Sequence, residues 1–180
     1  MPCNLTTGYT LDCREALGGV KSVYIGVATG FNISATTTNG LASQVRVTNA
    51  AGVVQFTLSA ATGLVTAPMY EFQQPRQSAV LTETGNFSEE NGTVFYSQVL
   101  TFFINRLQSA DLNNLKLLGQ NQKLVVVVKD NNDNYFLLGN DTGAIVTNST
   151  GSTGTAFGDR SGVQIEVTGF STVPMYELNF

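Results

Sequence analysis

Side chains that could do chemistry are scarce in this 180-residue chain. It contains no histidine, which excludes a Ser-His-Asp triad, a Cys-His dyad and any metal site that uses imidazole. Two cysteines, Cys3 and Cys13, are too few for a four-thiolate zinc site. They lie close together in the sequence, so they either close a small loop or remain free thiols in a reducing compartment. In the absence of an export signal we favour free thiols.

One stretch has part of the spacing of a calcium-binding loop. Oxygen-bearing side chains occupy loop positions 1, 3, 5 and 12, namely Asp130, Asn132, Asn134 and Asp141. Position 6, where the sharp turn needs glycine, is Tyr135, and the last carboxylate is Asp where a bidentate Glu is usual. Residues 135–138 also have the composition of a strand. We therefore expect a plain hairpin turn at 130–133.

Glycines and acidic residues form no recognisable catalytic pattern either. Gly151, Gly154 and Gly158 lack the spacing of a dinucleotide fingerprint, and their segment has no lysine for a phosphate loop. Glu89 and Glu90 are neighbours, and neighbouring side chains point apart instead of facing one substrate. We therefore predict no catalytic, cofactor-binding or metal-binding residue, expect no cofactor, and predict that the chain is not an enzyme.

The composition is that of a weakly charged globular protein. Hydrophobic residues make up 42% of the chain and charged residues only 12%, with a net charge of −4. Thr, Ser, Asn, Gln and Gly take the place of the missing charge, which favours a surface that desolvates easily in contacts with copies of itself. The nine basic residues are scattered, which argues against a nucleic-acid-binding surface: Arg14, Lys21, Arg46, Arg76, Arg106, Lys116, Lys123, Lys129 and Arg160.

The elements that would position any site are mostly strands. β-branched and aromatic residues, alternation and turn residues predict strands at 20–27, 43–48, 53–59, 68–72, 77–84, 92–104, 123–129, 135–138, 143–147, 163–169 and 173–180. The dipeptide Asn39-Gly40 favours a hairpin turn, and residues 85–91 read as a polar turn. The strand at 92–104 is apolar on both faces toward its end, as a central strand would be.

One helix is predicted, at about residues 109–119. Ser109 is placed to cap its first turn, Asp111 suits the positive end of the helix dipole, and Gly119 is expected at the C-cap. Leu115 is one of the leucines that share its apolar face. The fold class that follows is mainly β: an antiparallel β-sandwich or barrel with one flanking α-helix.

The length fits one domain, residues 1–180. Two polar stretches stand apart from the expected core, an N-terminal arm at 1–17 and a long loop at 148–162, and we expect both to act between subunits. The segments 67–72 and 173–178 resemble each other, as APMYEF and VPMYEL. Either a β unit is duplicated or two strand starts coincide. The N-terminus lacks the basic and apolar regions of a signal peptide, and no apolar stretch is long enough to cross a bilayer.

Several local motifs stand out as a set: TLDCR (10–14), GGVKSVY (18–24), ENGTVFY (90–96), LKLLGQN (115–121), GTAFGDRSG (154–162) and PMYE (174–177). They resemble motifs of small virion proteins of tailed phages, particularly phages that infect Bacteroidetes. The resemblance extends over most of residues 9–27 and 87–178, whereas 28–66 has no counterpart.

By size and element order, the resemblance implies a tail tube subunit, also called a major tail protein, with a tail-tube-like fold. Such subunits combine a sandwich, one helix and a long hairpin, and assemble into stacked, hexameric rings around a DNA channel. The expected partners are other copies of the chain and other phage tail proteins, with DNA only as passing cargo and no membrane. The expected location is the virion, assembled in the host cytoplasm. Alternatives are a neck, ring or head–tail joining protein and, from another class, a secreted carbohydrate-binding β-sandwich.

Overall fold

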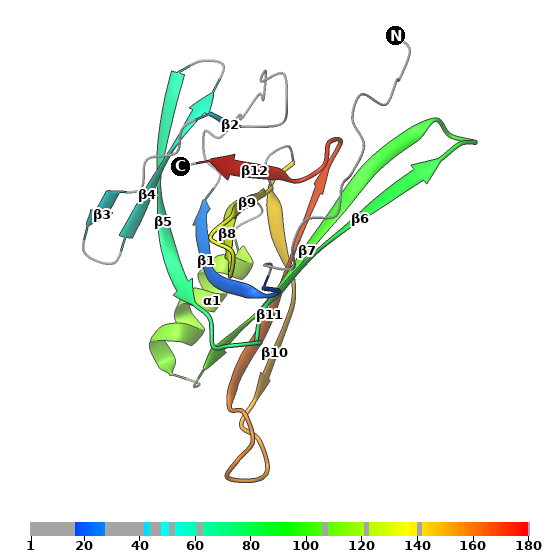
Figure 1. Ribbon diagram of the computed structural model, residues 1–180. Coiled ribbons are helices and arrows are strands. Elements are labelled where there is room, and N and C mark those ends of the chain that lie inside the picture. The colour runs from blue at the N-terminus through cyan, green and yellow to red at the C-terminus, as the bar shows by residue number, and fades with distance from the viewer. Residues whose placement is uncertain are drawn as a thin grey trace.

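A computed structural model describes residues 17–27, 42–43, 48–50, 53–60, 63–105, 108–120, 123–139 and 142–179. Cys3, Cys13, Asp141, the Asn39-Gly40 turn and nearly all of the expected arm 1–17 lie outside these residues. The described chain is mainly β with one helix, as predicted (Figure 1). Its elements are β1 Val20–Val27, β2 Ala42–Ser43, β3 Thr48–Ala50, β4 Val53–Ala60, β5 Gly63–Gln73, β6 Val80–Ser88, β7 Thr93–Asn105, α1 Ser109–Gln120, β8 Leu124–Asp130, β9 Tyr135–Leu138, β10 Ala144–Ser152, β11 Gly162–Ser171 and β12 Tyr176–Asn179.

The strands form one open sheet that folds into two layers. Its longest path is β3-β4-β5-β1-β8-β10-β11-β7-β6, with β9, β12 and β2 branching from β8. Along most of its second edge β8 pairs with β9, and it meets β10 only where Leu124 lies opposite Ala144. The described ends of the path, β3 and β6, do not pair with each other. Of the two predicted forms, the open sandwich therefore describes the fold and the closed barrel does not.

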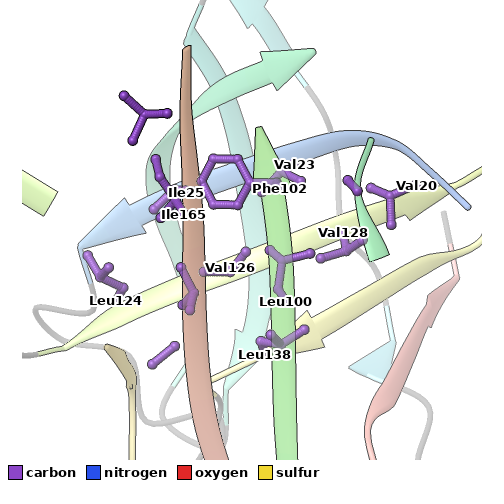
Figure 2. Packing of buried hydrophobic residues seen from close by; sticks show 14 residues of the cluster. Val20, Val23, Ile25, Leu100, Phe102, Leu124, Val126, Val128, Leu138 and Ile165 are labelled. Atoms are coloured by element: carbon purple, nitrogen blue, oxygen red, sulfur yellow. The ribbon is translucent and has the colours of Figure 1, made fainter. Parts of the chain in front are cut away.

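The core lies between the two layers. In Figure 2 the strands β7 and β11 cross β1 and β8, and their inward side chains meet. Alternate residues of β7, β8 and β11 supply most of this cluster, because successive side chains of a strand point to opposite faces. In β1 a bulge between Val20 and Ser22 shifts the alternation. The members are Val20, Val23, Ile25, Ala79, Leu100, Phe102, Leu124, Val126, Val128, Leu138, Ala144, Val163, Ile165 and Val167.

β8 is buried on both faces, as are residues 22–26 of β1. Val125 and Val127 are as fully buried as Val126, so the four consecutive valines have no solvent face. The strand predicted at 92–104, β7, has the expected central position, between β11 and β6, but its second face is partly exposed. Aromatic and branched residues occupy both faces of either strand, so composition alone could not separate them.

The helix α1 lies where the sequence placed it. It spans Ser109–Gln120, and Leu115 and Leu118 pack against the core cluster. Gly119 lies inside the helix instead of capping it. Leu117 points away from the core and is 58% exposed. The flanking helix is therefore confirmed, with a narrow apolar stripe.

Several strand boundaries differ from the prediction. Pro68 does not begin a strand, because β5 starts at Gly63 and Pro68 lies opposite Gln55 of β4. It is tolerated because β1 pairs with β5 only at residues 70–73, so at Pro68 the other edge needs no N–H donor. In the similar segment 173–178 the first three residues precede a strand, and the last three form the start of β12. The two segments thus have unlike positions, and the duplicated unit is not supported.

Two polar stretches that were predicted to be turn and loop are largely strand. Residues 85–88 continue β6, and residues 148–152 continue β10 opposite β11. Each stretch is rich in Gly, Asn, Ser or Thr, residues with little preference for strands or adapted to turns. Pairing with a strong neighbouring strand overrides that preference. The expected loop 148–162 therefore shrinks to residues 153–161, a result that contradicts the prediction.

Candidate functional site: an apolar hairpin arm

The hairpin β6–β7 extends past the strand that supports it. β11 pairs with β7 from Asn105 only as far as Tyr96, where its partner is Ser171. Beyond that point, among the described strands, β6 and β7 pair only with each other, from Asn86 opposite Phe95 to Ser88 opposite Thr93. We call residues 85–96 the arm. Figure 1 shows the hairpin projecting from the body as a two-stranded ribbon.

The arm carries apolar side chains that no core covers. Phe87 is 71% exposed, and Val94, directly opposite it, is 49% exposed. The Phe87 ring meets the Tyr96 ring edge-on, with centroids 6.0 Å apart. These three residues continue the inward face of the sandwich, because Leu100 and Phe102 on the same strand face belong to the core.

The opposite face of the same hairpin carries one aromatic side chain, Phe95, among the polar residues Asn86, Ser88 and Thr93. Phe95 contacts Phe170 of β11 with ring centroids 6.2 Å apart, and both remain more than two-fifths exposed. A two-stranded ribbon has no interior, so neither face can bury its aromatics within the subunit. Isolated exposed hydrophobic residues are ordinary, but a contiguous group on a projecting element marks an interaction surface.

The charges of the arm lie at its tip and base. Glu89 and Glu90, which the sequence excluded as a catalytic pair, are both exposed in the turn at the tip. At the base, the Glu83 carboxylate accepts hydrogen bonds from Gln98 Nε2 at 3.2 Å and from the Met175 N–H at 2.7 Å. Residues 77–105 contain no Lys or Arg. The arm thus combines exposed apolar side chains with an acidic tip.

The stretch with calcium-loop spacing forms the β8–β9 hairpin turn that was predicted. The Asp130 carboxylate accepts hydrogen bonds from the backbone N–H groups of Asn132 and Asn134, at 2.8 and 2.7 Å, and from their side-chain amides. These hydrogen bonds from the Asp130 side chain stabilise the turn that follows it. Lys129 Nζ lies 2.8 Å from the Asp133 carboxylate, which holds the pKa of Asp133 below its usual value.

This turn also binds the backbone of residues 17–18, which precede β1. Asn131 Nδ2 donates to the Gly18 carbonyl at 2.7 Å, and the Leu17 N–H donates to Asn132 Oδ1 at 2.7 Å. Asn132 Nδ2 returns a hydrogen bond to the Leu17 carbonyl. Of the two asparagines that resembled metal ligands in the sequence, Asn132 therefore binds the backbone of Leu17, and Asn134 binds Asp130.

The glycines of the excluded phosphate loop are spread along the β10–β11 hairpin: Gly151 lies in β10, Gly154 and Gly158 in the connecting loop. Next to them, one outer face of the hairpin has a shallow depression of about 220 Å³, lined by Asn148, Thr150, Gln164 and Glu166. It is smaller than typical ligand pockets and has no aromatic side chain for stacking on a sugar.

A polar cluster on β1 and β5 has a structural explanation. Ser22 Oγ and Tyr24 Oη donate hydrogen bonds to Glu71 Oε1, at 2.9 and 3.3 Å. Burial, and then the Glu71 charge, raise the pKa of Tyr24 to about 12. The phenol therefore stays protonated, and the cluster joins two strands at their paired residues Tyr24 and Glu71.

The described residues form neither a membrane-spanning helix nor a metal-binding cluster. Within the described ranges, no helix is long and apolar enough to cross a membrane, and no three His, Cys, Asp or Glu side chains gather as a metal site. The aromatics of the arm were missed as site residues because their alternation is the same as that of a core strand.

No protein-family model matches the chain, and no curated protein or solved structure matches it either.

Proposed function

We propose that the chain is a structural protein that assembles with copies of itself, as a tail tube subunit of a tailed phage. The observation that carries this proposal is the arm, which exposes Phe87, Val94 and Phe95 on a ribbon without a core. A second copy is a suitable cover, because the same chain offers apolar surface and few charges to desolvate.

The acidic, weakly charged chain also suits a tube around DNA. A channel that grips phosphates would need clustered Lys and Arg. The basic residues of this chain are few and dispersed, and the net charge is −4. Repulsion between such a lining and the phosphates leaves DNA free to slide. The likeness to virion proteins of tailed phages comes from the sequence motifs, and the tail tube among them from chain size and element order. The alternative is a neck, ring or head–tail joining protein.

Sedimentation velocity and electron microscopy of the purified chain across concentrations test self-assembly. We expect rings or tubes at micromolar concentration: stacked tubes support the tail tube, and single rings support the neck or ring protein. A chain that stays monomeric at every concentration contradicts the proposal.

An arm variant identifies the surface responsible. Phe87→Ser with Val94→Ser should abolish assembly while the melting temperature of the monomer stays nearly unchanged, because both side chains are exposed. Ile145→Ser is the matched control, since Ile145 is 42% exposed on β10, outside the arm. Assembly that is lost equally in the control would show that general surface hydrophobicity, and not the arm, drives association.

A further inference from the structure

A second projection leaves the body in a different direction from the arm. It is the end of the β10–β11 hairpin, whose connecting residues 153–161 we call the tip loop (Figure 1). Its flanking residues Ser152 and Gly162 pair directly. The sequence predicted a long unstructured loop here, but the tip loop is short and internally hydrogen-bonded.

The Asp159 carboxylate cross-links the tip loop. Asp159 Oδ2 accepts hydrogen bonds from the Thr155 N–H, the Ala156 N–H and Thr155 Oγ1, at 2.8, 2.8 and 2.9 Å. The Asp159 N–H donates to the Ala156 carbonyl at 3.0 Å. Gly154 has φ of +73°, and a Cβ there would lie 2.6 Å from Asp159 Cβ, so the closed turn requires glycine at this position.

This closed turn presents Phe157 fully to solvent. The relative exposure of Phe157 is 114%, the highest among the exposed large hydrophobic residues of the described chain. A large apolar side chain on a turn that is already ordered loses little conformational entropy on binding. Phe157 therefore has the properties of an interface anchor and contributes nothing to the subunit's own core.

The charge beside Phe157 complements the arm. Arg160 is exposed and stacks on the Phe103 ring, with its guanidinium carbon 4.7 Å from the centroid. It is the single cation in residues 142–179, and Asp159 is engaged in the turn. The tip loop thus carries an aromatic and a cation, and the arm carries aromatics and the acidic pair Glu89 and Glu90.

We propose that Phe157 of one copy docks on the apolar arm of the next copy, with Arg160 facing Glu89 and Glu90. This inference rests on the proposed self-assembly and identifies its contact. The two surfaces are different parts of the chain, so the contact is heterologous. Contacts of that kind close into rings or extend into filaments, whereas a two-fold dimer would use one surface twice.

Phe157→Ser tests the anchor. We expect the concentration at half-assembly to rise about 30-fold or more, as for an interface hot spot, with the monomer's melting temperature unchanged. Tyr70→Ser is the control, because Tyr70 is 59% exposed on β5, outside both surfaces. Assembly that tolerates Phe157→Ser would overturn the inference, and so would an equal loss in the control.

Charge reversal tests the pairing. Glu89→Lys with Glu90→Lys should weaken assembly, and Arg160→Glu should do the same. Combining all three should restore assembly at least about tenfold relative to either parent, because opposite charges then face each other again. A purely structural role for Arg160 on Phe103 would show no such rescue, and an absent rescue refutes the contact.

The outcomes for the two proposals are separable. A wild-type chain that remains monomeric contradicts self-assembly itself, and with it the contact. A wild-type chain that assembles, together with a Phe157→Ser variant that assembles equally well, leaves the proposed function standing and removes only this contact between arm and tip loop.

Discussion

Strand β7 gives the sharpest test of the division between core and arm. Leu100 is fully buried in the sandwich, whereas Val94 on the same strand face is 49% exposed on the arm. Truncating a fully buried leucine to alanine removes apolar burial and leaves a cavity. Together these effects lower the free energy of unfolding by about 2–5 kcal/mol. Val94→Ala removes exposed methyl groups, and surface changes of this kind stay within about 0.5 kcal/mol.

The assay is thermal and urea denaturation at a concentration where the chain is monomeric. For a domain of this size each kcal/mol shifts the melting temperature by roughly 2–4 °C. Leu100→Ala should therefore melt roughly 4–20 °C lower, on the same principle, and Val94→Ala less than about 2 °C lower. Equal losses would refute the reasoning, because they would mean that the arm is packed within the subunit.

Three further outcomes are expected. Gly139→Ala should cost about 2 kcal/mol or more in urea unfolding, because φ there is +76° and a Cβ would lie 2.6 Å from backbone atoms of β8 and β10; wild-type stability would contradict this crowding. The pKa of Tyr24 is raised to about 12 from 10.0, so its stabilisation is complete below pH 10 and disappears as pH rises toward 12. Stability measured from pH 9 to 12 should fall less in Tyr24→Phe, and equal slopes would count against the shift. Leu115→Ala should cost about 2 kcal/mol, since Leu115 packs on the core but is only half-buried, whereas exposed Asn114→Ala should change the melting curve little; the reverse order would exclude the assigned helix face.

The sequence was sufficient where local pattern and tertiary pairing agree. Strand β1 has the predicted bounds, Val20–Val27, and helix α1 differs from its prediction by one residue at the end. The β8–β9 hairpin also forms at the expected turn, where Asp130 organises the backbone. In each case the residues that favour the element, β-branched, helix-forming or turn residues, act over a few positions of the chain.

Prediction failed where long-range pairing overrides local preference. Residues 85–88 and 148–152 contain Gly, Asn, Ser and Thr, yet both segments are strands. The first pairs with β7 along its whole length, and the second pairs with β11. The arm was not predictable for a related reason. Whether Phe87 and Val94 are buried depends on where β11 ends, at Ser171 opposite Tyr96, and no local pattern encodes that point.

The continuity of β7 has a mechanical consequence. Its 13 residues extend for about 40 Å at the usual rise of a strand, from the tip of the arm to the far side of the core. Near the tip β7 pairs with β6 alone among the described strands, whereas from Tyr96 inward it is also held by β11 and by the fully buried side chain of Phe102. The support that β11 gives to this strand therefore begins near Tyr96. A load applied to the tip would be transmitted as torque into the sandwich, so a pull on one subunit would reach the interior of that subunit.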